Sequence, residues 1–84
     1  MKIYYSGKFA KEYKRLPHKI KILAEKKEII FRKDPFNVQL KTHKLSGRLK
    51  EYYSFSIDYQ YRIIFEFVGK DVWFHSVGTH EIYR

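Results

Sequence analysis

The first part of the chain has the apolar spacing of one short strand followed by two helices. Residues 2–5 are β-prone, and Ser6 suits the N-cap of a helix whose apolar side chains are Phe9, Tyr13 and Leu16. Pro17 ends this helix, and a second helix is predicted over residues 18–33. Its apolar arc consists of Ile22, Leu23, Ile29 and Ile30. Asp34-Pro35 ends it, because a residue before proline disfavours the helical region.

After an irregular stretch that reaches about Gly47, the apolar period changes to two, which is typical of strands with one buried face. In the first strand the apolar positions Leu49, Tyr53, Phe55 and Ile57 alternate with Lys50, Tyr52, Ser54, Ser56 and Asp58. The next strand has Tyr61, Ile63, Phe65 and Phe67 on one side and Arg62, Ile64, Glu66 and Val68 on the other. Gly69-Lys70 predicts a hairpin turn, and residues 72–77 return as a third strand before Gly78.

These elements predict a single α+β domain over residues 1–84, because a chain this short does not support two separate cores. The order is β-α-α-β-β-β. The simplest two-layer arrangement for that order is a small antiparallel sheet covered on one face by the two N-terminal helices.

Charge adds a partner class to this picture. The chain has 18 Lys and Arg against 9 Asp and Glu, a net charge of +9, and the excess lies in residues 1–50, where the net charge is +11. A polyanion such as nucleic acid, or an acidic protein, is the expected partner. Cysteine is absent, which excludes disulfides and thiolate metal sites, and no apolar run approaches the roughly 18 to 20 residues that cross a bilayer. We therefore expect a cytoplasmic protein without a membrane partner.

Three side chains near the ends of the later strands are candidates for chemistry. Arg62 is charged in a strand that favours neutral residues, so it reaches either an external anion or a carboxylate such as Glu66 or Asp58. His80 follows the last strand, where an imidazole is able to exchange protons at neutral pH, although an exposed histidine is often idle. Tyr83, with Arg84 after it, shares a side with His80 if the tail turns as a helix and frays otherwise.

Cleavage of RNA by its own 2′-hydroxyl gives such residues a common purpose. The reaction needs a base for the hydroxyl, an acid for the departing 5′-oxygen and a cation for the phosphate. A histidine, an arginine and a tyrosine or lysine supply these groups, so no metal or other cofactor is required. His18, His43, His75 and His80 have no metal-ligand spacing, and the sequence has no P-loop or nucleophile elbow. The residues by themselves indicate a basic domain that binds or cuts RNA.

Several segments in order resemble the RelE/ParE superfamily of bacterial toxins over nearly the whole chain. They are residues 34–36 (DPF), 43–47 (HKLSG), 61–65 (YRIIF) and 77–80 (VGTH). The resemblance implies a toxin of a type II toxin-antitoxin pair that a cognate antitoxin neutralises. RelE-like members enter the ribosomal A site and cleave mRNA without metal, whereas ParE-like members inhibit DNA gyrase by protein-protein binding. In such systems the toxin meets DNA only indirectly, through the antitoxin complex.

The same resemblance assigns roles to individual positions. Arg62 matches the strand arginine that contacts the scissile phosphate in RelE-type toxins, and Tyr83 falls at or near their tail aromatic. His80 and His43 match catalytic histidines of the YafQ branch, which makes them a candidate acid-base pair. The chain departs from that branch where Ser54 and Ser56 stand in the strand that carries a further histidine. The division of base and acid roles therefore stays open.

The basic segment around His43 has two readings. Its cations and the C-terminal arginine are expected to bind the phosphates of mRNA and ribosomal RNA: Lys41, Lys44, Arg48, Lys50 and Arg84. The rival reading is that they receive an acidic segment of the antitoxin. The leading functional hypothesis is thus a ribosome-dependent, metal-independent mRNA endoribonuclease, with a ParE-like gyrase inhibitor as the alternative and an RNA-binding member without activity as the third.

Overall fold

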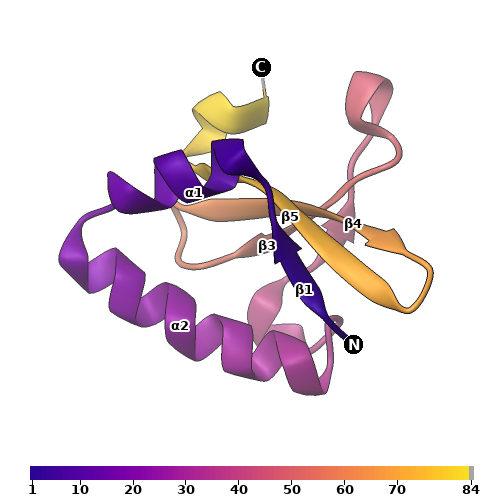
Figure 1. Cartoon of the computed structure of the whole chain (residues 1–84), viewed down its shortest axis with the longest axis horizontal. Helices are drawn as coiled ribbons and strands as arrows, with labels where there is room; N and C mark the ends of the chain where they lie inside the picture. Colours follow the sequence, from indigo (N-terminus) through magenta and orange to yellow (C-terminus); the bar gives the residue numbers. More distant parts are fainter. Residues whose placement is uncertain (84) are drawn as a thin grey trace.

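A five-stranded sheet and a pair of helices form the computed structural model, which describes residues 1–83 (Figure 1). The strands are β1 (Ile3–Tyr5), β2 (His43–Lys44), β3 (Tyr53–Ser56), β4 (Arg62–Val68) and β5 (Asp71–Gly78). The helices are α1 (Gly7–Lys14) and α2 (His18–Lys33). Three short 3₁₀ turns complete the chain: η1 (Val38–Leu40), η2 (Gly47–Leu49) and η3 (His80–Tyr83). The predicted α+β class is confirmed.

The sheet is mixed, where the sequence predicted an antiparallel one. Its strand order is β1-β5-β4-β3-β2, and β1 is parallel to β5 while the other neighbours are antiparallel. After β1 the chain forms the two helices and then strands β2, β3 and β4. The last strand, β5, pairs with β4 on one side and with β1 on the other, which makes β1 an edge strand. β2 was not predicted, since a strand of two residues shows no periodicity.

Helix α1 begins where the sequence indicates. The Ser6 hydroxyl accepts a hydrogen bond from the Phe9 backbone N–H at 2.9 Å, which confirms the predicted N-cap. The same hydroxyl donates to the His75 backbone carbonyl at 2.8 Å. The start of α1 is therefore fixed directly to β5.

Helix α2 is rotated relative to the predicted arc. Its buried residues are Ile20, Ala24 and Phe31, whereas Ile29 is 59% exposed. Phe31 sets this rotation, because its ring is fully buried and packs at centroid distances of 4.9 to 5.4 Å against three phenylalanines of the sheet, Phe55, Phe65 and Phe74. The aromatic core thus lies between α2 and the sheet.

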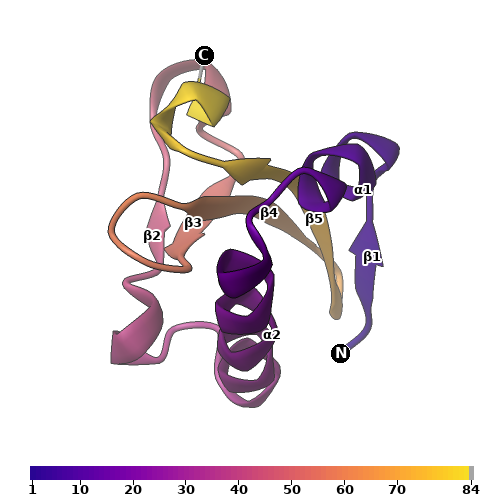
Figure 2. The same cartoon turned by 90° about the vertical axis from the view of Figure 1, so that its left-hand side faces the viewer.

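The opposite face of the sheet, called here the outer face, carries the last turn of the chain. In Figure 2, α2 lies on one side of the sheet and the C-terminal turn η3 on the other. Alternation along β4 assigns Ile63 and Phe65 to the core and Arg62 and Ile64 to the outer face, as predicted. Ile64 is nevertheless buried.

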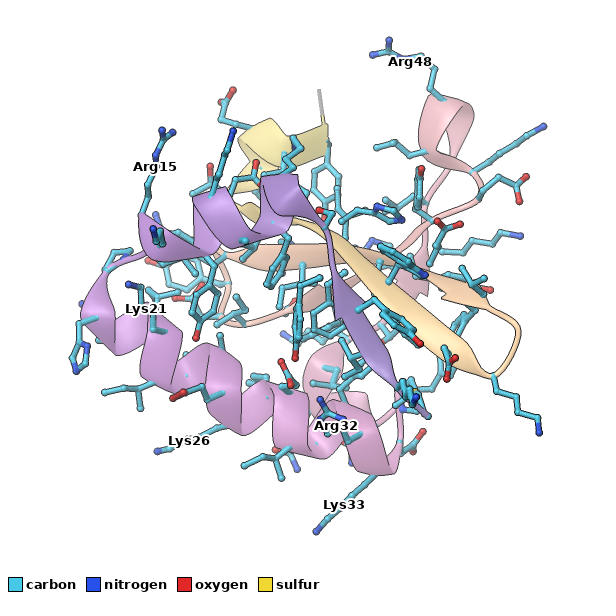
Figure 3. The ribbon with its side chains drawn as sticks, viewed as in Figure 1. Arg15, Lys21, Lys26, Arg32, Lys33 and Arg48 are labelled. Atoms are coloured by element: carbon cyan, nitrogen blue, oxygen red, sulfur yellow. The ribbon has the colours of Figure 1, made fainter. Side chains whose placement is uncertain are left out.

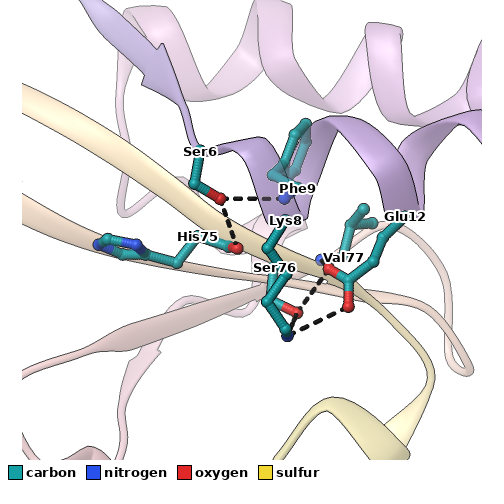
Figure 4. Close-up of polar contacts among 7 residues, drawn as sticks. All are labelled: Ser6, Lys8, Phe9, Glu12, His75, Ser76 and Val77. Atoms are coloured by element: carbon teal, nitrogen blue, oxygen red, sulfur yellow. Dashed lines mark hydrogen bonds and ion pairs between the residues drawn. The ribbon is translucent and has the colours of Figure 1, made fainter.

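A polar cluster joins α1 to the end of β5 (Figure 4). The Glu12 Oε1 atom accepts hydrogen bonds from the Ser76 hydroxyl at 2.8 Å and from the Val77 backbone N–H at 3.0 Å. Its Oε2 atom pairs with the Lys8 ammonium at 3.1 Å, which also donates to the Ser76 hydroxyl at 2.9 Å. The cluster holds the part of β5 that leads into η3.

Neither described helix is long and apolar enough to cross a membrane.

Candidate functional site

Arg62 begins β4 on the outer face, between Ser56 of β3 and Gly78 of β5. Its guanidinium donates hydrogen bonds to the Ser56 hydroxyl and, at 3.3 Å each, to the backbone carbonyls of Asp58 and Tyr59. All three acceptors are uncharged. They orient the guanidinium without neutralising it.

The ion pairs considered for Arg62 do not form within residues 1–83. The Asp58 carboxylate accepts the backbone N–H groups of Gln60 and Tyr61, at 2.8 and 2.7 Å. Glu66 contacts the His75 Nε2 atom at 2.7 Å instead. The half-buried Arg62 guanidinium therefore has no carboxylate partner among residues 1–83.

Turn η3 carries Tyr83 onto the sheet. The Tyr83 and Ser54 hydroxyls are 2.7 Å apart and hydrogen-bonded, and the Tyr83 ring lies 5.7 Å from the exposed ring of His80. Gly78 permits the close approach, since a Cβ atom there would lie 2.7 Å from the Ile82 Cγ2 atom. The predicted proximity of His80 and Tyr83 is confirmed for the described turn.

Two serines that the sequence assigned only to a polar strand face organise this site. Ser54 and Ser56 are buried, because Tyr83 bonds to one and Arg62 to the other. Alternate residues of a strand are about 6.6 Å apart on the same face. The Tyr83 hydroxyl and the Arg62 guanidinium therefore bond to neighbouring outer-face positions of β3. In the sequence, the signal for this part of the site was the presence of small polar residues at alternate positions within residues 54–56.

His43 lies at the edge of the same face. It is exposed and directly opposite Ser54 in the β2–β3 ladder, so both side chains point to the outer face. Its Nδ1 atom is 3.2 Å from the carbonyl oxygen of Lys41, whose φ of 53° turns the chain into β2. Within residues 1–83 no ring contact or hydrogen bond joins His43 to His80, so their acid-base pairing stays a prediction.

A pocket of about 350 Å³ opens beside Tyr83, between η2 and η3, and is lined by Ser46, Arg48, Leu49 and Tyr83. Of the predicted RNA-binding residues, Arg48 reaches this pocket. The other cations of this segment are exposed: Lys41, Lys44 and Lys50. Arg84 lies outside the described residues.

Most of the other described cations lie on or beside the helices, and Lys2 and Lys70 lie outside them. Arg15, Lys26 and Lys33 extend outward from the helical layer, and Arg48 projects from η2 on another side of the molecule (Figure 3). The Lys21 ammonium instead lies over the Tyr13 ring, 5.9 Å from its centroid. Lys44 pairs with Tyr53 in the β2–β3 ladder, next to the pair of His43 with Ser54. Residues 1–83 contain no group of three His, Asp or Glu side chains arranged to hold a metal ion.

A second hollow, of about 850 Å³, lies on the other side of the sheet between α1 and α2. The Tyr5 hydroxyl at its rim donates to the Glu28 carboxylate at 2.8 Å. Burial, and then the bond to Glu28 and its negative charge, raise the pKa of Tyr5 above the ordinary value of 10.0. Burial likewise raises the pKa of Tyr13. This hollow is separated from Arg62 by the core.

Comparison with solved structures identifies the class of fold. The YoeB/ParE toxin from Agrobacterium tumefaciens has the same fold, with a TM-score of 0.79 at 18% identity, over 95% of this chain and 99% of that one. YafQ from E. coli strain BL21(DE3) matches with a TM-score of 0.73 at 25% identity, over 96% of this chain and 94% of that one. The fold is that of small RelE-like toxins.

The family follows from the sequence. The profile of YafQ, the bacterial toxin of a type II toxin-antitoxin system, matches residues 1–83, and the chain belongs to this family. The YafQ chain in the E. coli DinJ-YafQ complex is similar at 26% identity, with a TM-score of 0.69 over 95% of this chain and 93% of that one. A comparison with curated protein sequences found no significant match. The protein is a type II toxin.

Proposed function

We propose that this toxin is a ribosome-dependent mRNA endoribonuclease formed by the single domain of residues 1–84. In the proposed reaction a ribose 2′-oxygen attacks the adjacent phosphorus atom, and the bond from phosphorus to the 5′-oxygen breaks. A base takes the 2′ proton and an acid protonates the departing oxygen, which leaves a cyclic phosphate on one fragment. All atoms come from RNA and exchangeable protons, so the step needs no metal or cofactor.

One observation carries the proposal: within the described chain, Arg62 keeps a half-buried guanidinium free of carboxylates, one strand step from the Tyr83 hydroxyl. A cation held by neutral acceptors stabilises the extra negative charge of a phosphate in the transition state. His80 stands beside Tyr83 as the candidate proton carrier, and His43 at the edge of the same face is the second one.

Binding partners follow from the same surface. Five cations are proposed to bind the phosphates of mRNA and of ribosomal RNA in the A site: Lys41, Lys44, Arg48, Lys50 and Arg84. The solved complex of a relative with DinJ supports a cognate antitoxin as the second partner. Since ribosomes are the proposed site of action, the protein is expected to work in the cytoplasm and to meet DNA only within the antitoxin complex.

The test is primer extension on a reporter mRNA in a purified translation system. Wild-type protein is expected to produce new cuts only when ribosomes are present. Arg62→Ala and His80→Ala are each expected to weaken cutting by about 10²-fold or more, as loss of a phosphate-stabilising or proton-transferring group does.

Arg15→Ala and His18→Ala are the matched controls, because both side chains are exposed on the helical layer and belong to the same residue types. They should cut like the wild type. If Arg62→Ala and His80→Ala also cut like the wild type, the assigned site is wrong. Growth arrest without any cuts would overturn the nuclease proposal, and gyrase inhibition by purified protein would then establish the ParE-like alternative.

A further inference from the structure

A row of aromatic rings crosses the part of the outer face that η3 leaves open. Tyr4 of β1 stacks on Trp73 of β5 with ring centroids 5.1 Å apart and planes at 21°. Trp73 is nearly parallel to His75, at 6.3 Å and 17°, and His75 meets the Tyr52 ring edge-on at 5.1 Å. We call Tyr4, Trp73, His75 and Tyr52 the aromatic strip.

The strip is separate from the hydrophobic core. Trp73 lies between the fully buried Val72 and Phe74, so its side chain points to the outer face. Tyr4 is its partner in the parallel β1–β5 ladder and shares that face. Tyr4 is 39% exposed and Trp73 is 36% exposed, so large π-surfaces remain in contact with solvent. Exposed rings on a sheet are the surface on which many single-stranded RNA-binding domains stack bases.

The strip also adjoins the candidate site. The Tyr52 backbone N–H donates to the Leu49 carbonyl at 2.9 Å, and the Leu45 N–H donates to the Tyr52 carbonyl at 2.9 Å. Leu49 and Tyr83 both line the pocket at η2 and η3. An RNA strand that leaves this pocket along the outer face therefore meets Tyr52 first, and then His75 and Trp73.

The charge pattern favours bases over phosphates on the strip. Its rings are apolar faces with polar edges, and the acidic Glu66 touches His75 at 2.7 Å, which disfavours a phosphate there. Exposed cations lie in the loop at the Tyr52 end, where Lys44 and Lys50 are, and beyond the opposite end, where Lys2 precedes Tyr4 and Lys70 precedes β5. An acidic protein segment would be drawn to that loop and away from Glu66. A single-stranded RNA matches both surfaces, because its bases would stack on the rings while its phosphates contact the lysines of the loop.

We propose that the aromatic strip is a stacking platform for two or three bases of single-stranded RNA next to the scissile phosphate. The inference rests on the proposed function for its place in the reaction, but the binding itself needs no cleavage. Stacking tolerates any base, so the strip contributes affinity and alignment without selecting a sequence.

Trp73 is the sole tryptophan of the chain and reports directly on the strip. Its fluorescence is measured while 2′-O-methyl hexauridine, which resists 2′-hydroxyl attack, is added to the full-length toxin. Saturable quenching by this oligomer, and little quenching by an abasic hexamer with the same phosphates, is the expected result. Quenching of equal size by the abasic hexamer would show a phosphate contact and overturn the proposal.

Variants extend the test to affinity, measured by anisotropy of a labelled oligomer. Trp73→Leu is expected to weaken binding by about 10-fold or more, the loss of one stacked base. Tyr59→Leu is the control, since Tyr59 is 81% exposed in the β3–β4 turn and lies off the strip. Circular dichroism checks that both variants fold. Equal affinity of the two variants would overturn the proposal, as would a dimer of the free toxin that Trp73→Leu dissociates.

Arg62→Ala distinguishes this proposal from the nuclease proposal. It should weaken cutting by about 10²-fold or more, while hexauridine still quenches Trp73, because the strip does not include Arg62. Cutting by the wild type without base-dependent quenching overturns the strip alone. Quenching by the wild type without any ribosome-dependent cutting overturns the nuclease assignment and supports the strip as an RNA-binding surface.

Discussion

The Glu12 carboxylate gives the sharpest test of how α1 is fixed to β5, because its two oxygen atoms bind different partners. Oε1 accepts from the Ser76 hydroxyl and the Val77 N–H, and Oε2 meets Lys8. Glu12→Ala leaves the first two groups without their acceptor in a part of the structure where Ser76 is buried. Hydrogen bonds to a charged group are worth about 1.5 to 3 kcal/mol each, and such losses add incompletely. The free energy of unfolding should fall by about 3 kcal/mol.

Glu12→Gln separates hydrogen bonding from charge. Its amide oxygen is able to replace Oε1 and keep both buried bonds, so only the pair with Lys8 is lost. The Lys8 side chain is 64% exposed, and pairs of that kind contribute about 0 to 1 kcal/mol. We therefore expect Glu12→Gln to cost less than about 1 kcal/mol.

Thermal unfolding at pH 7 measures the difference. For a domain of this size each kcal/mol shifts Tm by about 4 to 8 °C, so Glu12→Ala should lower Tm by about 15 °C and Glu12→Gln by about 4 °C. Glu25→Ala, at an exposed position of α2, controls for the loss of a glutamate from a helix. A Tm for Glu12→Ala within about 4 °C of the wild type, or equal losses for both Glu12 variants, would refute the reasoning.

Three further results are expected. In Gly78→Ala the new Cβ atom would lie 2.7 Å from the Ile82 Cγ2 atom, so η3 should be displaced and ribosome-dependent cutting should fall about 10-fold through misalignment. Adding Ile82→Ala to the same chain should restore cutting. Failure of this rescue would contradict the role of the glycine. The folded state holds the Tyr5 phenol proton more tightly than the unfolded chain, so the stability it contributes is complete below pH 10.0 and is lost as pH rises through the raised pKa. Denaturant unfolding between pH 9 and 11.5 should therefore show a shallower loss for Tyr5→Phe than for the wild type, and identical slopes would disprove the link. Replacing Lys44 and Lys50 with Gln should reduce the slope of log affinity for single-stranded RNA against log salt by about 1.4, and an equal change from Lys26→Gln with Lys33→Gln would argue against the loop as the RNA contact.

Local sequence signals predicted the elements whose cause is local. The Ser6 cap set the start of α1, and the two-residue period of β4 assigned its faces correctly. The end of α1 is at Lys14, earlier than predicted, and Pro17 is the N-cap of α2. The rotation of α2 was predicted wrongly, since Ile29 is apolar but the arc is set by Phe31, whose packing partners lie more than twenty residues away. Local spacing contains no information about those partners.

Pairing and burial in the site depend on distant segments in the same way. The parallel alignment of β1 with β5 joins the two ends of the chain, and no pattern within residues 3–5 distinguishes it. Arg62 and His80 were identified because their residue types are unusual at a strand start or a strand end. Ser54 and Ser56 were taken as solvent-facing positions, and their burial arises from Tyr83 and Arg62, which reach them from other elements.

The edges of the sheet limit how copies of this toxin can associate. β1 has three residues and β2 has two, so each outer edge offers little main chain for another strand to pair with. Where β1 ends, α1 takes over, and the Glu12 side chain occupies the Val77 N–H that a foreign strand would otherwise use. Both edges therefore offer little main chain for growth of the sheet from one molecule into the next. Such short edges disfavour association through the backbone, while the exposed aromatic rings stay available for recognition by side chains.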